Sequence, residues 1–355
     1  MSKYPRVVAY PEKLMENART ILSWCAGSGV EVTFVGKCIA EDPALVPGIL
    51  ATGMARLADS RAENLAAVET DLPKVLLRIG MPDAAEETVA AAEISLQSER
   101  TTIEALNRAA GKLGRRHKII LMIDLGDLRE GILFSDTEEI LETARAVLES
   151  EHLELYGVGT NLTCYGSVVP DERNMGILCR IAGMIENRFG ITLPVVSGGN
   201  SSSLHLLREG GMPSRVNDLR IGEALLLGTD TYTGNKYPEL HDDGFVLEAQ
   251  IVEVREKPSF PIGKRTVDAF GKEQEYQDLG IMCRAILAVG KQDVPVDALI
   301  PMEKEVSVIG GSSDHLIVNL GTSPAKVGDV LRFKLTYGGL LGAYTSKYVA
   351  KAIGE

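Results

Sequence analysis

The sequence predicts an α/β protein with a (β/α)8 TIM-like barrel followed by a mostly β C-terminal domain. Over the first two-thirds of the 355 residues, short apolar runs alternate with amphipathic helical stretches, as in parallel strands joined by crossover helices. Eight such runs fall within roughly 200 residues, and eight is the strand number of a closed barrel. After residue 235 the pattern changes to alternating runs broken by turns, which indicates the second domain.

The barrel strands are expected at 31–37, 56–59, 75–79, 93–96, 119–124, 155–161, 194–197 and 218–221. Between them, apolar residues recur at helical spacing, for example at Ile103, Leu106 and Ala110. The alternative is a doubly wound open sheet, which usually binds a nucleotide at a glycine-rich first turn. The nearest candidate for such a turn, Gly157-Val-Gly159, lacks the third glycine, so the closed barrel is favoured.

The second domain is expected to contain strands at 245–254, 282–289, 305–309, 316–320 and 330–335. A further run at 6–10 would be a ninth strand in the barrel, so we assign it to the β domain, which brings the two ends of the chain together. The predicted division is therefore 11–235 for the barrel, and 1–10 with 236–355 for the β domain.

Composition excludes several classes of function. Lys and Arg total 37 against 49 Asp and Glu, a net charge of −12, which makes nucleic acid and anionic membranes improbable partners. We find neither a secretory signal nor a run of about 20 apolar residues, so a cytoplasmic protein is expected. The five cysteines are scattered without a C-x-x-C pair and H-E-x-x-H is absent, so no metal site is expected. The basic run at 115–118 is interpreted as a solvated helix end.

Lys37 is a candidate nucleophile. In a (β/α)8 barrel, active residues lie at the C-terminal ends of the strands, and Lys37 ends an apolar strand there. Burial lowers the pKa of a lysine and frees its amine to attack carbonyls. The alternative is a strand-end lysine that extends into solvent.

A phosphate site is predicted after the last two barrel strands. The segment 197–203, SGGNSSS, supplies backbone N–H groups and hydroxyls that can hold a phosphate, although an ordinary turn with a helix cap is an equal alternative. Arg220-Ile-Gly222 follows the eighth strand and completes the usual barrel phosphate site. A reactive lysine and a phosphate site together describe a pyridoxal 5'-phosphate centre.

The chain resembles the fold-type III pyridoxal-phosphate enzymes, and most closely the alanine/ornithine racemase group of the alanine racemase superfamily. The resemblance rests on seven short motifs that run from the first barrel strand into the second domain. In this order and spacing they are specific, although each alone is weak. They are VGKC at 35–38, ADSR at 58–61 with Asn64, DLGDLREG at 124–131, SGGNSS at 197–202, LRIGE at 219–223, GKQD at 290–293 and GGSSDH at 310–315.

The resemblance implies roles for the barrel residues. Lys37 would hold the cofactor covalently, exchange it for the substrate amine and act as one acid/base at Cα. Arg220 would face the pyridine nitrogen; because a guanidinium only donates, that nitrogen stays unprotonated, which suits racemisation. Arg129 would lie near the cofactor's phenolic oxygen and the substrate carboxylate, or alternatively pair with Glu130 or Asp127. The phosphate would be bound by Asn200, Ser201, Ser202 and Gly222.

The sequence departs from the alanine racemase pattern in the second domain. The family's catalytic tyrosine, supplied by the partner subunit, is replaced by Lys291, which becomes the candidate second base. Cys283 and a C-terminal tyrosine, Tyr344 or Tyr348, are reserve candidates. The family's methionine before an aspartate near the substrate carboxylate becomes Ser313 before Asp314, and a histidine expected beside the ring becomes Asn161.

The expected function is an amino-acid racemase that uses pyridoxal phosphate and two-base proton transfer at Cα. The expected substrate is ornithine or another basic amino acid, and the expected assembly is a homodimer with shared active sites. The alternatives are an alanine racemase, a fold-type III amino-acid decarboxylase and a non-catalytic pyridoxal-phosphate carrier. Arg220 argues against the decarboxylase, and the second domain argues against the carrier.

Overall fold

The computed structural model describes residues 3–39, 42–267, 270–271, 273 and 276–354. The chain divides into two compact units: Glu12–His241, and Met1–Pro11 with Asp242–Glu355. We call them the barrel unit and the β unit, and describe each by itself.

Eight parallel strands close the barrel into a ring. β2 pairs with β3 on one side and β10 on the other, and β5 pairs with β6, so no edge is left open in the ring. This confirms the predicted barrel and excludes the open sheet. The ring consists of β2 (Glu31–Val35), β3 (Arg56–Asp59), β4 (Lys74–Leu76), β5 (Ile94–Gln97), β6 (His117–Asp124), β8 (Leu153–Gly159), β9 (Val195–Ser197) and β10 (Asp218–Ile221). A short strand, β7 (Ile132–Leu133), pairs with β6 outside it.

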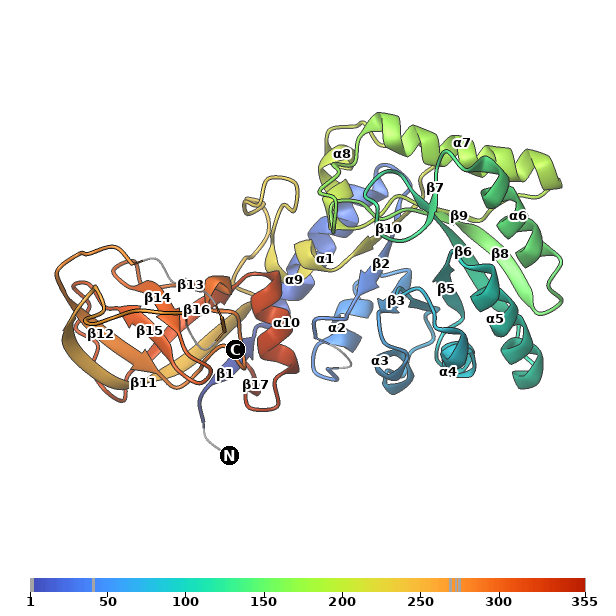
Figure 1. Ribbon diagram of the computed structural model, residues 1–355. Helices are drawn as coiled ribbons and strands as arrows, with labels where there is room; N and C mark the ends of the chain where they lie inside the picture. Colours follow the sequence, from blue (N-terminus) through green and yellow to red (C-terminus); the bar gives the residue numbers. More distant parts are fainter. Residues whose placement is uncertain (1–2, 40–41, 268–269, 272, 274–275, 355) are drawn as a thin grey trace. The chain divides into compact units, whose positions relative to one another are not determined.

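Helices follow the strands and cover the outer face of the ring (Figure 1). The longest, α7 (Glu172–Phe189), begins with a capping box between Asp171 and Asn174 and ends at the left-handed Gly190. The others are α1 (Pro11–Ala26), α2 (Val46–Leu50), α3 (Ala62–Ala67), α4 (Ala85–Ala91), α5 (Arg100–Leu113), α6 (Thr137–Leu148), α8 (Leu204–Arg208) and α9 (Glu223–Leu227).

The barrel strands bury both faces, as parallel strands in a barrel do. In β6, Ile119 and Leu121 belong to the apolar layer shared with the helices, whereas Ile120 and Met122 belong to the interior of the ring. The interpretation of 115–118 as a solvated helix end is wrong for His117. This residue begins β6 and is 1% exposed, because its side chain lies on the same face of the strand as the buried Ile119 and Leu121.

The β unit is a mostly antiparallel sheet in the order β13-β16-β11-β12-β15-β14. Part of the segment 6–10, which we expected in this domain, forms β1 (Arg6–Ala9), and β1 pairs antiparallel with β11 and parallel with β17. The sheet consists of β11 (Phe245–Pro258), β12 (Ile281–Leu287), β13 (Leu299–Pro301), β14 (Ser307–Gly311), β15 (Leu316–Asn319), β16 (Val330–Leu335) and β17 (Ala350–Ile353), and it is accompanied by the helix α10 (Tyr337–Thr345).

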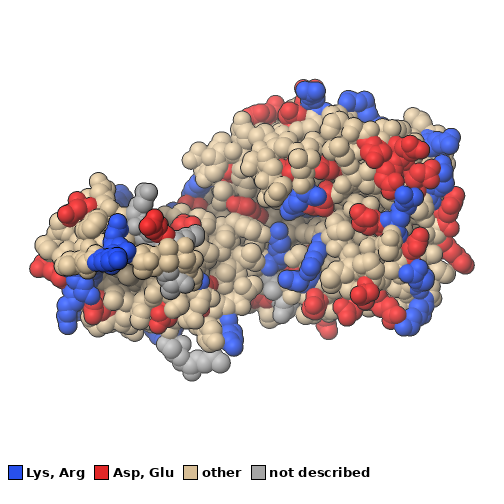
Figure 2. All heavy atoms as spheres, in the orientation of Figure 1, with Lys and Arg blue, Asp and Glu red and all other residues tan. Residues whose placement is uncertain are grey.

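Acidic and basic side chains are interspersed on the face drawn in Figure 2, which agrees with a chain that carries no excess of positive charge. Within the described ranges, every helix is too short or too polar to cross a bilayer. The same residues include no cluster of three His, Cys, Asp or Glu side chains suited to hold a metal ion.

Candidate active site

Lys37 lies at the C-terminal end of the barrel, two residues beyond β2. The Gly36 N–H donates to the Ala58 carbonyl oxygen at 2.9 Å, which places Lys37 beside Asp59 at the end of β3. On the other side, a Cβ on Gly222 would lie 3.0 Å from the Val35 carbonyl oxygen, so Glu223 follows β10 next to the same turn. Lys37 is half-buried.

Asp59 and Glu223 place two carboxyl groups near Lys37. Burial raises the pKa of Asp59, while hydrogen bonds from Arg61 and Asn64 and the charge of Lys37 act in the opposite direction. Burial likewise raises the pKa of Glu223, opposed by the charge of Lys37. The lysine therefore sits between two acidic groups that come from the strands on either side of β2.

The segment after β9 is a tightly bonded turn. Asn200 caps the 3-10 helix Ser201–Ser203, its side-chain oxygen accepting from the Ser202 N–H at 2.8 Å. The Ala224 N–H donates to Ser201 Oγ at 3.2 Å, which joins this turn to the segment after β10. The two parts of the predicted phosphate site are thus held together.

The same turn contains a polar atom that fits a ligand. Ser202 is 2% exposed, and its Oγ is buried without a hydrogen-bond partner. Buried hydroxyls without partners are rare and call for an explanation. Gly199 at φ +102° gives the turn a backbone conformation that residues with a Cβ rarely adopt. These features fit a phosphate group accepting from Ser202.

Arg220 is buried in the barrel interior at the end of β10, with 4% exposure. Its guanidinium donates to Ser197 Oγ on β9 and, at 2.5 Å, to the Thr160 carbonyl oxygen after β8. Burial lowers the pKa of Arg220 below its usual value, opposed mainly by the charge of Asp218. An arginine nevertheless stays ionised in proteins, so a fixed positive charge lies inside the barrel mouth.

Arg129 forms an ion pair with the adjacent Glu130, which was the alternative considered for it. Asn161 Nδ2 also donates to Glu130 Oε1, at 3.1 Å, and the Asn161 side-chain oxygen accepts from Asn200 at 2.6 Å. The charge of Glu130 reaches Arg220 as well. The loops after β6, β8 and β9 therefore meet around one polar cluster.

Asp127 fixes the loop after β8. Its fully buried carboxylate accepts backbone N–H groups from Thr163 at 2.9 Å, Tyr165 at 3.0 Å and Val168 at 3.1 Å. The rim of the predicted site is thus built by loop-to-loop hydrogen bonds rather than by helices or strands.

Three of the candidate residues in the β unit, Lys291, Ser313 and Asp314, lie close together. The Lys291 N–H donates to the Ser312 carbonyl oxygen at 2.9 Å, and the Gln292 N–H donates to that of Ser313 at 2.9 Å. Asp314 is exposed, and its carboxylate accepts hydrogen bonds from the hydroxyls of Ser312 and Ser313. The Lys291 ammonium lies 4.2 Å from the centre of the Phe270 ring. The two motifs of the resemblance in this unit are therefore adjacent in space.

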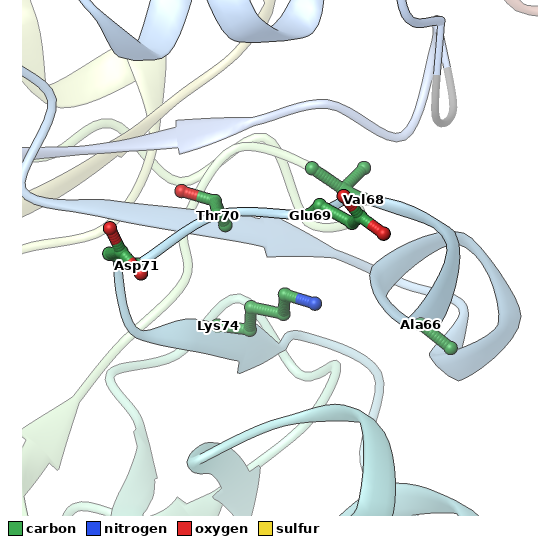
Figure 3. Close-up of a pocket in the computed structure, with 6 residues that line it drawn as sticks. All are labelled: Ala66, Val68, Glu69, Thr70, Asp71 and Lys74. Carbon is green, nitrogen blue, oxygen red and sulfur yellow. The ribbon is translucent and has the colours of Figure 1, made fainter.

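A separate hollow on the barrel unit does not coincide with this cluster (Figure 3). It has a volume of about 550 Å3 and precedes β4, at the N-terminal end of that strand. Lys74, which lines it, donates to the Leu65 carbonyl oxygen at 2.7 Å. Active residues of such barrels lie at the opposite end, so we assign this hollow no role.

The sequence suggested no role for two polar residues near the candidates, Thr33 and Arg56, which are buried inside strands. The usable signal was a polar residue in an otherwise apolar parallel strand, since such strands usually bury apolar side chains on both faces.

Comparisons with known proteins identify the family. The model described as "Alanine racemase, N-terminal domain" matches residues 11–230. The chain is 41% identical over 353 residues to ornithine racemase of Acetoanaerobium sticklandii, covering 99% of each chain. It is 36% identical over 352 residues to lysine racemase of Thermotoga maritima, covering 98% of each.

The fold is shared with a solved structure, alanine racemase from Bartonella henselae with covalently bound pyridoxal phosphate. The TM-score is 0.72 at 17% identity, and the match covers 99% of this chain and 100% of the other. The closed barrel, the short motifs at the C-terminal ends of its strands and the match to the family model all indicate the same family. The chain belongs to the family of the alanine racemase N-terminal domain.

Proposed function

We propose that this protein is a pyridoxal-phosphate-dependent amino-acid racemase that acts on basic amino acids, with ornithine preferred. The observation that supports it most is the cluster at the barrel mouth: Lys37 between two carboxyl groups, a buried arginine on β10, and an unpartnered hydroxyl in the turn after β9. The two relatives that match nearly the whole chain are an ornithine racemase and a lysine racemase.

The residues present fit pyridoxal phosphate. Ser202, Ser201, Asn200 and the Gly222 backbone would hold its phosphate, and Lys37 would hold its aldehyde carbon. When bound, the cofactor supplies an electron sink that acidifies the Cα–H bond of a covalently held amino acid.

The chain's own groups would then handle the proton. Lys37 would take the proton from one face of Cα, or deliver a proton to that same face when the reaction runs in reverse, and Asp59 and Glu223 would be polar neighbours of its amine. Arg220 would face the ring nitrogen and, having no acceptor, leave it unprotonated. The weaker electron withdrawal that the cofactor would then supply would favour return of a proton to Cα, which distinguishes a racemase from a decarboxylase.

The second face of Cα would be served by Lys291 of a partner subunit, in a cytoplasmic homodimer with shared active sites. Arg129, Ser313 and Asp314 would contact the substrate. Asp293 is buried and accepts from Ser346 Oγ at 2.8 Å, so the exposed Asp314 is the better partner for a basic side chain.

The test uses holoenzyme reduced with borohydride, followed by peptide mapping. The peptide containing Lys37 should carry the label, and Lys37→Ala should lose racemisation even where cofactor still binds. Labelling of another lysine would overturn the site assignment.

The substrate and the reaction are tested by incubating the holoenzyme with L-ornithine, L-lysine or L-alanine in deuterated water. Exchange at Cα with formation of the D-enantiomer should be fastest for ornithine. Release of carbon dioxide without D-product would indicate the decarboxylase, and no exchange with any amino acid would indicate a carrier.

A further inference from the structure

A chain of buried polar groups continues from Arg220 into the barrel. Ser197 Oγ accepts from Arg220 and donates to Asp218 Oδ2. The other carboxylate oxygen of Asp218 accepts from Thr33 Oγ1 at 2.6 Å and from Arg56 at 3.2 Å. The chain thus joins β9, β10, β2 and β3 across the interior of the ring.

The direction of these hydrogen bonds is fixed by the number of protons available. A serine hydroxyl has one proton, and that of Ser197 is given to Asp218. Its lone pairs therefore face Arg220, which can only donate. The orientation of the Arg220 guanidinium is therefore set by the Asp218 carboxylate, to which it is linked through two hydrogen bonds.

Asp218 also supplies charge. Arg220 and Asp218 are 4% and 2% exposed, and a buried guanidinium needs a nearby counter-charge. The charged groups that act on Arg220 are Asp218 and Glu130, which favour its ionised form, and Arg129, which disfavours it; the Cys164 thiol is a further titratable neighbour. Of the two carboxylates, Glu130 pairs with Arg129, and Asp218 is the one linked to Arg220 through a hydroxyl.

We propose that Ser197 and Asp218 are positioning residues for Arg220: they orient its guanidinium and balance its charge. The pH midpoint of the cofactor absorbance and kcat/KM therefore depend on both Ser197 and Asp218. The proposal rests on the proposed function, because it assumes that Arg220 faces the cofactor. A purely structural role would instead stabilise the barrel without acting through Arg220.

The experiment is a double-mutant cycle on holoenzyme. Ser197→Ala and Asp218→Asn are each made in the wild type and in Arg220→Gln, and two quantities are measured: the pH midpoint of the visible cofactor absorbance and kcat/KM. In the wild-type background, Asp218→Asn should shift the midpoint by about one unit to lower pH, because loss of a negative charge destabilises nearby cations. Ser197→Ala should lower kcat/KM by about ten- to a hundredfold, since two buried groups lose their partner.

In the Arg220→Gln background, each substitution should change kcat/KM by less than about twofold and the absorbance midpoint by at most a few tenths of a pH unit. This is expected because the effects of interacting residues are non-additive. Equal effects in the two backgrounds, or no effect in the wild type, would overturn the proposal. If Asp218→Asn does not fold, the Ser197 arm alone decides.

Ser95→Ala is the matched control. Ser95 is also a fully buried serine on a barrel strand, but it bonds to His117. It should leave the absorbance midpoint unchanged. Failure of the proposed function is recognised separately, because wild-type protein would then form no borohydride-reducible adduct at Lys37 before any variant is compared.

Discussion

His117 is a buried titratable group away from the candidate site. Its Nε2 lies 2.8 Å from Ser95 Oγ, and Gln97 Nε2 donates to the same hydroxyl oxygen at 3.0 Å. Burial lowers the pKa of His117 from 6.5 to about 4. The folded protein therefore holds this imidazole neutral under conditions in which an unfolded chain protonates it.

The free energy of unfolding should consequently fall as the pH is lowered. Above pH 6.5 the imidazole is neutral in both states and contributes nothing; between 6.5 and about 4 only the unfolded state binds the proton, which costs the folded state up to about 3 kcal/mol. Chemical denaturation at several pH values should show a smaller loss over this range for His117→Gln than for the wild type. His152→Gln, at a half-exposed histidine, is the control and should keep the wild-type slope. Parallel pH profiles for the wild type and His117→Gln would contradict the assignment.

The sequence predicts the location of some residues of the candidate site but not the contacts that others make. Lys37 lies two residues beyond β2, and Arg220 is the last residue but one of β10; because the C-terminal ends of barrel strands share one face, their common location follows from sequence order. The hydrogen bond between Ser197 and Asp218 depends on rotamers and on the register between strands. That feature comes from tertiary packing, which local pattern does not encode.

At the scale of elements, the loop after β8 offers a direct test of how the rim is held. Asp127→Ala removes the acceptor of three backbone N–H groups. Amide hydrogen exchange of residues 163–168 should then accelerate by about a hundredfold, since each lost bond contributes about 1 kcal/mol. Asp230→Ala, which removes a similar cap on Tyr232 in another loop, should leave that exchange unchanged. Wild-type protection in Asp127→Ala would show that other contacts hold the loop.

Strands were more predictable than the last helix. Arg56–Asp59, Asp218–Ile221 and Val330–Leu335 have the bounds expected from apolar pattern. α10 was not predicted, because its sequence YGGLLGAYT carries three glycines, which disfavour helix. A Cβ on Gly339 would lie 2.8 Å from the Ala298 carbonyl oxygen, so the glycine permits a close approach that sequence alone does not reveal.

At the scale of the whole molecule, the proposal of shared active sites predicts complementation. Lys37→Ala and Lys291→Met homodimers should each be inactive as racemases. After subunit exchange, a mixed dimer contains one site with Lys37 from one chain and Lys291 from the other. The mixture should regain about a quarter of wild-type activity if half the dimers are mixed. No recovery, with mixed dimers demonstrated by differential tagging, would place both residues in one subunit or exclude Lys291 from the reaction.

The position of β1 has a consequence for how the chain is made. β1 precedes the whole barrel in the chain, whereas its partners β11 and β17 both follow the barrel. The barrel strands are complete once β10 has emerged from the ribosome, whereas β1 must keep its backbone groups solvated until β11, and then β17, has been made. The order of synthesis thus favours a folded barrel before the β unit, and β1 completes its pairing only when β17 has emerged.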